Sequence, residues 1–272
     1  MIKLDKTVVS GFSAAIRGMR NAKNSWDRAD SIAGFYSEDA IPELIDKAVT
    51  NFLNKMGIEE DDTRYANSYK ALYDFYYKNC ILSRDSNTGI VDCFIMGGND
   101  LDLASTLAKA GTDHGKFLRQ IQISVDITAP LFFWKEFDTY KVGTVANSTS
   151  TMHTIANNPI TMQNFSFEVM LPGDKISDAM CDMITVVNIC EDLRKKYLEV
   201  KAAGDEKLAK EYWRLLIEIL PNGWLQTRTV TLNYAVAKNI YNARHGHKLK
   251  EWHTVCDWIA KLPYAKELIL AK

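Results

Sequence analysis

Residues 220–253 read LPNGWLQTRTVTLNYAVAKNIYNARHGHKLKEWH, a segment in which a strand pattern passes directly into a helix pattern. The period of residues 225–232 is that of a strand with one buried face. Helices are predicted from about 234 to 243 and from 249 to 261. Asn233 lies between the strand and the first of these helices, a position where asparagine is a preferred N-cap.

A second segment, residues 127–151, reads ITAPLFFWKEFDTYKVGTVANSTST. It continues a strand that starts at Gln120, because apolar residues occupy every second position from 121 to 127. Pro130 then opens a predicted helix, since proline is well tolerated in the first turn. Residues 144–151 are small and polar, so this stretch is predicted to be a loop.

The rest of the chain is predicted to be mainly helical. A weak strand pattern covers 6–16, and residues 18–26 are typical of a polar loop. Ser37 is the predicted N-cap of a helix that ends at Gly57. Further helices are predicted at 64–82, 99–111, 176–203 and 205–219. The chain has no proline- or glycine-rich linker, which favours one domain over 1–272 with a helical insertion-like region around 37–95.

The composition is that of an ordinary globular protein. Of 272 residues, 47% are hydrophobic, and 33 basic residues against 34 acidic ones give a net charge of −1. This balance gives no bulk attraction to nucleic acid or to a membrane surface. Neither a signal peptide nor a membrane-spanning run is recognisable, so a cytoplasmic protein is expected. The odd number of cysteines, five, favours reduced thiols over a disulfide framework or a zinc site.

The two quoted segments resemble the flavin-dependent thymidylate synthases, the ThyX family. Residues 127–151 are similar to the family's stretch in which a strand leads through Ala-Pro into a helix and then into the motif Arg-His-Arg-x-x-Ser. In an ungapped alignment the triplet falls on Thr139, Tyr140 and Lys141 and the serine on Thr144. The family's later glutamate, serine and arginine fall on Asn147, Thr149 and Thr151.

Residues 220–253 are similar to the family's C-terminal strand and helix, which carry Asn-x5-Asn-x4-Arg. Here these residues are Asn233, Asn239 and Arg244, at the family's spacing. A further family arginine falls on Ala235. Because a guanidinium grips phosphate with two parallel hydrogen bonds, replacing arginines weakens phosphate binding. Two lost charge-assisted bonds correspond to roughly two to four powers of ten in affinity.

The resemblance implies an α/β (α+β) ThyX-like fold with a mostly antiparallel sheet and long helices. It also implies reductive methylation of a pyrimidine deoxynucleotide, dUMP to dTMP, by a homotetrameric flavoprotein that binds FAD. NADPH and methylenetetrahydrofolate belong to that reaction. The alternative is a catalytically silent protein of the same fold that binds or sequesters nucleotides. Degenerate proteins of this kind resemble those carried by bacteriophages.

The resemblance also assigns site residues. It implies a cofactor site that includes Asn233, Asn239, Tyr140 and Lys141, and a substrate site that includes Arg244, Thr144 and Thr149. No catalytic residue is assigned. Each of these cofactor-site and substrate-site residues also has a simpler structural interpretation, as a helix cap, a core ring, a solvated charge or part of a polar turn. Two cations close in sequence to the motif, Arg119 and Lys135, are candidates to replace its lost charges.

Two further groups of residues are candidates for an ion site. Three histidines, at 245, 247 and 253, suggest a metal cluster, but Gly246 breaks the helical register and a solvated loop is preferred to a metal site. Three cations within seven residues, Arg17, Arg20 and Lys23, are able to gather a phosphate. A solvated basic loop is the preferred interpretation of that stretch.

Overall fold

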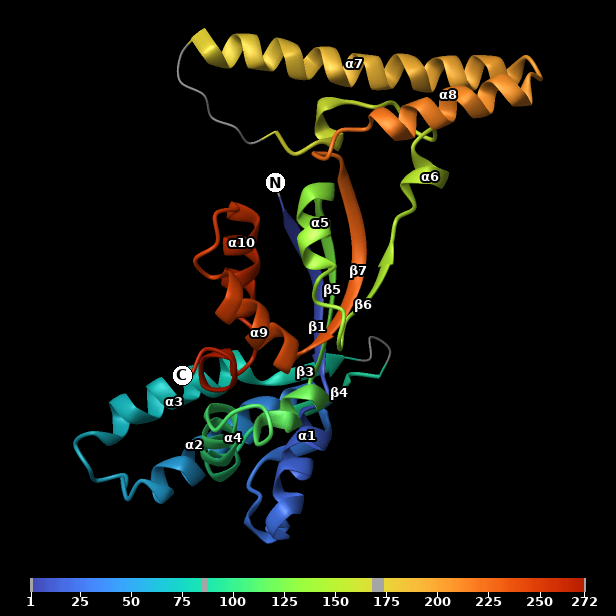
Figure 1. Ribbon diagram of the computed structural model, residues 1–272. Helices are drawn as coiled ribbons and strands as arrows, with labels where there is room; N and C mark the ends of the chain where they lie inside the picture. Colours follow the sequence, from blue (N-terminus) through green and yellow to red (C-terminus); the bar gives the residue numbers. More distant parts are fainter. Residues whose placement is uncertain (1, 85–87, 168–173, 272) are drawn as a thin grey trace. The chain divides into compact units, whose positions relative to one another are not determined.

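A computed structural model describes residues 2–84, 88–167 and 174–271, and it contains two sheets and a series of helices (Figure 1). The larger sheet has the strand order β1-β5-β7-β6, and the smaller has the order β2-β4-β3. The expected class, mixed α and β with antiparallel sheets and long helices, is confirmed.

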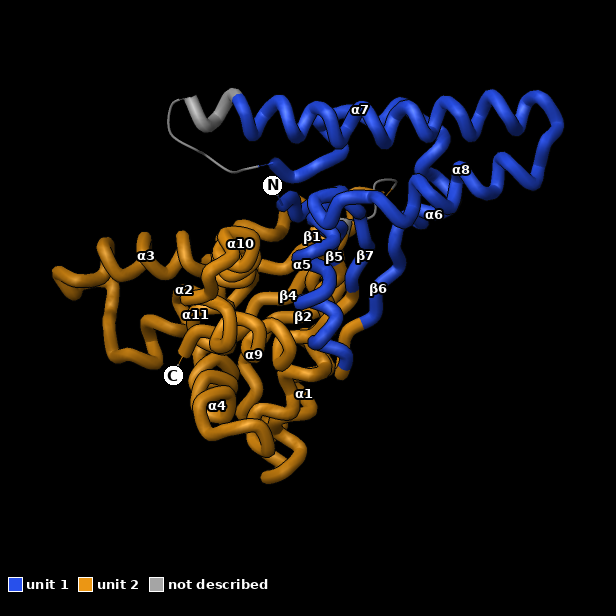
Figure 2. Tube along the Cα trace, turned by 45° about the horizontal axis from the view of Figure 1, so that its top comes forward, with its two compact units in different colours: residues 1–6, 125–141, 145–230 blue, residues 7–124, 142–144, 231–272 orange. Residues whose placement is uncertain are grey.

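The chain divides into two compact units, which Figure 2 distinguishes by colour. Unit 1 comprises residues 1–6, 125–141 and 145–230, and unit 2 comprises 7–124, 142–144 and 231–272. A division into compact units does not measure whether they fold separately, so the single domain over 1–272 stays a prediction.

The four-stranded sheet consists of β1 (Lys3–Ser10), β5 (Gln122–Pro130), β7 (Leu225–Asn233) and β6 (Val145–Ser148). Side-chain hydrogen bonds join Ser124 to Thr231 and Thr128 to Thr227. As the residue number rises along β5 it falls along β7, so the two strands are antiparallel. Both strands were predicted. The face of β5 that bears Ile123, Val125 and Ile127 is buried, as its alternation indicates.

The predicted loop at 144–151 is wrong in part, because residues 145–148 form strand β6 at the edge of this sheet. All four residues of β6 are exposed. Because neither face of the strand is buried, its sequence lacks the alternation of apolar and polar residues by which a strand is recognised. Just after the strand, Thr149 exchanges hydrogen bonds with Thr227 of β7. Backbone pairing, which small polar side chains permit at an edge, decides the structure here.

Unit 2 is built around the three-stranded sheet of β2 (Ile32–Ser37), β4 (Ile90–Ile95) and β3 (Ile81–Arg84), in which both pairings are antiparallel. Helices α2 (Ile41–Lys55) and α3 (Tyr65–Asn79) pack against it through a core that includes Ile45, Val49 and Tyr76. The unit also contains α1 (Phe12–Arg20), α4 (Gly98–Lys109), α9 (Tyr234–Arg244), α10 (Lys250–Ile259) and α11 (Ala265–Leu268).

Several predictions in unit 2 are wrong. The strand at 6–16 is β1 only to Ser10, after which Gly11, at φ +88°, turns the chain into α1. The polar loop at 18–26 begins inside α1 and continues as short 3-10 turns. Ser37, the last residue of β2, is the N-cap residue of a 3-10 turn (Glu38–Ala40) that leads into α2, and its side chain makes no capping hydrogen bond. The helix predicted over 64–82 ends at Asn79, and β3 follows.

Unit 1 carries two of the predicted helices, α7 (Asp174–Ala202) and α8 (Glu206–Ile219), which pack side by side as a hairpin (Figure 1). Gly204 turns the chain at φ +84°, and the Asp205 side chain caps α8 by accepting from the Leu208 N–H at 3.0 Å. Val187, Cys190 and Leu216 form the core of the hairpin. The predicted break at Gly204-Asp205 is confirmed.

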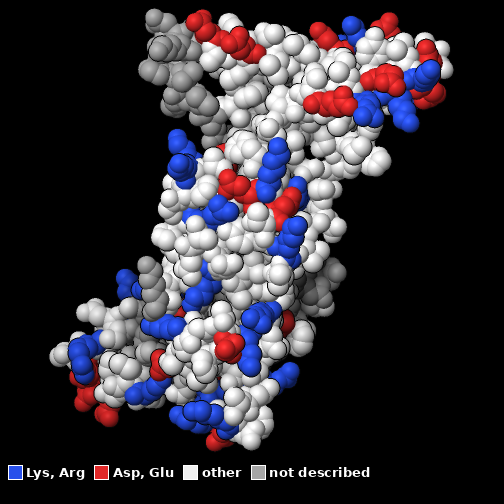
Figure 3. Space-filling model, in the orientation of Figure 1, with Lys and Arg blue, Asp and Glu red and all other residues white. Residues whose placement is uncertain are grey.

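Unit 1 also contains α5 (Leu131–Phe137) and α6 (Thr151–Thr154). Pro130 is the N-cap residue of α5, as predicted for a helix that opens at this proline. Among the described residues, no helix combines the length and the hydropathy that a bilayer-crossing segment requires. Acidic and basic side chains are interspersed along the hairpin face in Figure 3, in keeping with the balanced overall charge.

Candidate functional site

The junction of β7 and α9 places the first of the predicted site residues. Asn233 is 9% exposed, and its Oδ1 accepts a hydrogen bond from the Val236 N–H at 3.0 Å. The simpler interpretation of Asn233 as a helix N-cap is therefore correct. The cap uses the side-chain oxygen, which leaves the amide nitrogen pointing to other neighbours.

One of these neighbours is Gly143, in the loop that follows the Thr139-Tyr140-Lys141 triplet. A Cβ atom added to Gly143 would lie 2.8 Å from Asn233 Nδ2 and 3.2 Å from a methyl carbon of Val236. The backbone of Gly143 also has φ +79°, a conformation that favours glycine. The loop therefore passes directly against the start of α9. The two segments that carry the family resemblance meet at this point, about 90 residues apart in the chain.

A cleft of about 770 Å³ opens beside this contact, and all of its lining residues belong to unit 2. Helix α9 contributes one side through Asn233, Asn239 and Asn242. The other sides come from Val142 and Gly143, from the end of α4, from the 3-10 turn η4 (Gly115–Gln120) and from Ala271. This volume lies in the range of small-molecule sites.

Three cations line the cleft, namely Lys109, Arg119 and Lys238, and none of the described lining residues is acidic. Lys238 Nζ donates to the carbonyl of Ala108 at 2.7 Å and to that of Ala271 at 3.4 Å. Burial, and to a lesser extent the charge of Lys109, lowers the pKa of Lys238. The carboxamides and cations together suit an anionic ligand that also needs hydrogen-bond partners.

Thr144, which takes the place of the motif serine, follows Gly143 directly. Its hydroxyl oxygen is buried and has no hydrogen-bond partner within the described structure. A buried polar group left without a partner costs about 1–3 kcal/mol. An unpaired buried hydroxyl next to a cleft-lining residue is therefore a site where a ligand contact would be favourable.

Arg244 does not line the cleft that Asn233 and Asn239 line. Its guanidinium carbon is 4.7 Å from the ring centroid of Trp252, a buried side chain of α10. Asn239, Asn242 and Ala235 share the stripe of α9 that lines the cleft, and Arg244 does not line it. The substrate-binding role of Arg244 stays a prediction, but the contact in the structure is a cation–π packing between two helices.

The remaining predicted residues belong to unit 1. The Tyr140 ring packs beside that of Phe137, with centroids 6.3 Å apart, and Lys141 is exposed. Thr149 is engaged with β7, since its hydroxyl donates to the Thr227 carbonyl at 3.1 Å. Lys135, a candidate to replace lost charge, donates to Asn222 Oδ1 at 2.8 Å. Roles for Tyr140, Lys141 and Thr149 in ligand binding stay predictions.

Two other groups have structural partners. His253 Nε2 lies 2.7 Å from the His247 carbonyl, and His245 Nδ1 lies 3.0 Å from that of Tyr241. In the described part of the chain, no three His, Cys, Asp or Glu side chains are arranged to hold a metal ion. Arg20, expected in a solvated basic loop, is instead buried and paired with Asp100.

The structure adds Lys109, Lys238 and Asn242 to the residues that sequence reasoning identified, and it places Arg119 in the cleft. The spacing of Ala235, Asn239 and Asn242, at intervals of four and three residues, marks one face of a helix. That spacing was a usable signal for Asn242. Lys109 and Arg119 lie more than 110 residues from α9, and no local pattern connects them to it.

No known family model matches the sequence, and no curated protein sequence matches it. Among solved structures, the UMP/dUMP methylase PolB from Streptomyces cacaoi, bound with 5-Br UMP, is similar over 64% of this chain and 83% of its own, with 15% identity and a TM-score of 0.46. The flavin-dependent thymidylate synthase ThyX from Helicobacter pylori, complexed with FAD and dUMP, is similar over 88% of this chain and 97% of its own. Its identity is 14% and its TM-score 0.46.

Proposed function

We propose that the unit 2 cleft binds a pyrimidine nucleotide through its phosphate, in a pocket related to that of the ThyX family. One observation carries the proposal. Val142 and Gly143 of the loop and the asparagines of α9, which come from the two resemblance segments, line the same cleft. That cleft is lined by cations and carboxamides, the donors that a phosphate and a pyrimidine ring require.

Within the cleft, Arg119 and Lys109 are the proposed phosphate ligands. Lys238 already donates to two backbone carbonyls, so it fixes the end of α4 and adds positive charge without reaching far into the cleft. Arg119 thus takes the place of guanidinium groups that Thr139 and Thr151 lack. The amides of Asn239 and Asn242, which both accept and donate, are proposed to contact the base or the sugar.

Isothermal titration with dUMP, UMP and uridine tests this proposal. We expect the nucleotides to bind and uridine, which lacks the phosphate, to bind at least tenfold more weakly. Arg119→Ala should lower nucleotide affinity by about 10- to 100-fold, since a hydrogen bond to a charged group contributes about 1.5–3 kcal/mol. Arg28→Ala, which removes an exposed arginine elsewhere in unit 2, is the matched control. Equal affinity for uridine and dUMP would disprove phosphate recognition.

The second candidate function is the flavin-dependent methylation of dUMP to dTMP. Asn233 and Asn239, at the family's spacing for the flavin site, line the same cleft, and this observation favours it. The tight glycine at 143 and the unpaired hydroxyl of Thr144 are compatible with a ligand that approaches the backbone closely. A bound reduced flavin would supply the hydride. Methylenetetrahydrofolate and NADPH belong only to this second function.

Flavin uptake distinguishes the two candidates. The protein is incubated with FAD, passed through a desalting column and examined for the visible absorption of a flavin. Retained flavin that is lost in Asn239→Ala supports the flavoenzyme, and dTMP formation with folate and NADPH then tests activity. A protein that binds dUMP but retains no flavin supports nucleotide binding without that chemistry. The homotetramer implied by the resemblance is tested separately by light scattering.

A further inference from the structure

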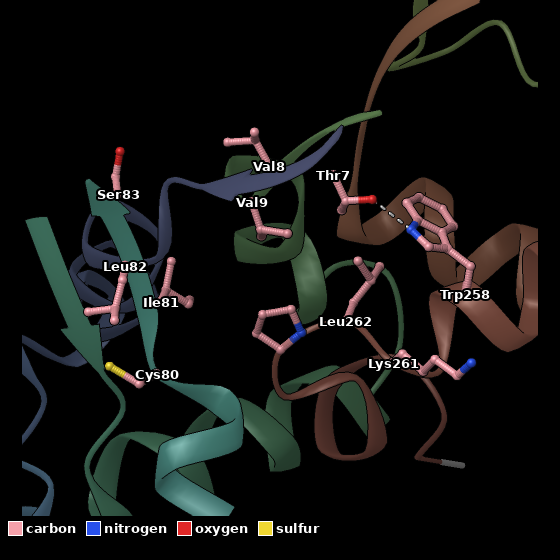
Figure 4. A pocket seen from close by; sticks show the side chains of 11 residues that line it. Thr7, Val8, Val9, Cys80, Ile81, Leu82, Ser83, Trp258, Lys261 and Leu262 are labelled. Carbon is pink, nitrogen blue, oxygen red and sulfur yellow. Dashed lines mark hydrogen bonds between the residues drawn. The ribbon is translucent and has the colours of Figure 1, made fainter. Parts of the chain in front are cut away.

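A second cleft in unit 2, of about 510 Å³, is lined by one member of a cysteine pair. Its walls are the Thr7–Val9 stretch of β1, the start of β3 and the chain around the end of α10 (Figure 4). Cys80, the residue before β3, lines this cleft and is half-buried. Figure 4 shows its thiol beside the start of β3, together with Ile81, Leu82 and Leu262.

The partner of Cys80 is Cys93, on the neighbouring strand β4. The two Sγ atoms are 3.7 Å apart, and Cys93 is only 1% exposed. The antiparallel register places Leu82 opposite Cys93 and Ile81 opposite Phe94, so Cys80 lies diagonally from Cys93 across the strand pair. The Cys80 N–H also donates to the Tyr76 carbonyl at 2.8 Å, which anchors the backbone at this point. The strand ladder and this bond hold the two thiols in contact.

A disulfide requires the sulfurs to approach to about 2.05 Å, so the pair has to close by roughly 1.7 Å. A change of that size lies within the reach of side-chain rotation when the two sulfurs already face each other. All five cysteines are free thiols in the structure. The two thiols are therefore in contact, and of the two residues only Cys80 lines the cleft.

We propose that Cys80 and Cys93 form a redox site that a low-molecular-weight disulfide oxidises to an intramolecular disulfide. The Cys80 thiolate attacks one sulfur of the reagent RSSR, which forms a Cys80–SR mixed disulfide and releases RS⁻. The Cys93 thiolate then attacks Cys80 Sγ and releases the second RS⁻. The two protons lost by the cysteines pass to the two RS⁻ groups. Two electrons move from the pair to the reagent, and the products are the protein disulfide and two RSH.

The order of the steps follows from access. The reagent reaches Cys80 through the cleft, whereas Cys93 is enclosed between the sheet and the helices of unit 2. Cys93 is thus the resolving thiol. No residue of this cleft lines the cleft of Lys109 and Arg119.

The test treats the reduced full-length protein with oxidised glutathione, blocks the remaining thiols with an alkylating reagent and maps non-reduced peptides by mass spectrometry. We expect a Cys80–Cys93 linked peptide, at least tenfold more abundant than any other cysteine pair and abolished by dithiothreitol. In Cys93→Ser the reaction should stop at a glutathione adduct on Cys80. Cys256→Ser, which removes a different buried thiol of unit 2, should leave the linked peptide unchanged.

Exposed Cys181 serves as the internal reference, because it should acquire glutathione in every sample. The proposal is overturned if Cys181 reacts while Cys80 stays unmodified in the wild type. It is also overturned if the wild type accumulates a stable glutathione adduct on Cys80 without the internal bond. Both results are read from the wild-type protein, so they do not depend on the folding of a variant.

Discussion

At the scale of single residues, Asp100 makes the most connected buried interaction of unit 2. It is fully buried at the start of α4 and accepts from Arg20 Nε at 2.6 Å. It also accepts from the Ser31 hydroxyl at 2.6 Å and from the backbone N–H groups of Asp30 and Ser31. This set of bonds joins α1, the start of β2 and α4 through one carboxylate.

We expect Asp100→Ala to lower the free energy of unfolding by about 3–5 kcal/mol, because it leaves the buried Arg20 guanidinium without its partner. Asp102 lies on α4, as Asp100 does, and forms an exposed ion pair with Lys55 of α2. Asp102→Ala should therefore cost less than about 1 kcal/mol. Urea denaturation of both variants measures the difference. Similar losses of unfolding free energy in Asp100→Ala and Asp102→Ala would show that burial does not make the Arg20–Asp100 ion pair more stabilising than an exposed pair.

A pH-dependent contribution is expected from Glu191 in unit 1. The Arg194 guanidinium holds the pKa of this carboxyl below its usual value, and the Ile160 N–H, which donates at 2.7 Å, assists. Since the folded-state pKa is lowered, the stabilisation is complete above the unfolded pKa of about 4.3 and is lost as the pH falls through the folded-state pKa.

Glu191→Gln should therefore flatten the fall in unfolding free energy that sets in as the pH drops below the unfolded pKa of about 4.3. Glu218→Gln, which removes an exposed pair with Arg214 on α8, provides the control. Unfolding free energies measured by urea at several pH values give the slopes. If Glu191→Gln keeps the wild-type slope, the carboxyl does not titrate with folding.

At the scale of elements, the junction between the 142–144 loop and α9 decides the candidate site. Its position depends on Gly143, where both the φ value and the distance to Asn233 exclude a side chain. Asn233, which caps α9, is thus also the residue against which the loop packs at Gly143. A change at Gly143 should disturb the cleft as well as the helix cap.

Gly143→Ala is expected to destabilise the protein more than Gly57→Ala does. Both positions have positive φ, which costs an L-residue about 1–2 kcal/mol, but nothing lies within 4 Å of a Cβ at Gly57. The difference between the two variants in thermal or urea unfolding isolates the contact with Asn233. Nucleotide affinity should fall in Gly143→Ala only. Equal stabilities would mean that the loop moves away without cost.

Sequence periodicity identified the long elements well and the short ones poorly. The strands β5 and β7 and the helices α7 to α10 were predicted because each repeats its pattern over several turns or pleats. The strands β2, β3 and β4 were missed. Four of the six residues of β4 are buried, with no regular alternation, and β3 has only four residues. An apolar segment of four to six residues is too short for its periodicity to show whether it is a strand or the end of a helix.

At the scale of the whole molecule, two hydrophobic clusters of the described residues lie in different units. The cluster around Ile45 and Tyr76 lies in unit 2, and the cluster around Val187 and Leu216 lies in unit 1. They share no residue. Each should therefore contribute to stability by its own packing, whatever the arrangement of the two units.

We expect Ile45→Ala and Leu216→Ala each to cost about 2–5 kcal/mol, as is usual for truncations in a packed core. The double variant should lose the sum of the two to within about 0.5 kcal/mol, because the residues share no packing partners. A double-mutant cycle by urea unfolding measures the coupling. A coupling energy well above that value would show that the two cores stabilise each other.

The sequence by itself determined the balance of charge, the long helices, the two central strands and the asparagine-bearing helix, since these follow from composition and local periodicity. Tertiary structure alone decided that the 142–144 loop meets α9, that Arg119 and Lys109 join the same cleft, and that Arg244 packs on Trp252 instead. The physical reason is that the cleft joins residues far apart in the chain, and that the contact of Arg244 with Trp252 depends on how α9 and α10 pack. These contacts depend on tertiary packing and on the left-handed turn at Gly143, and no local sequence pattern predicts them.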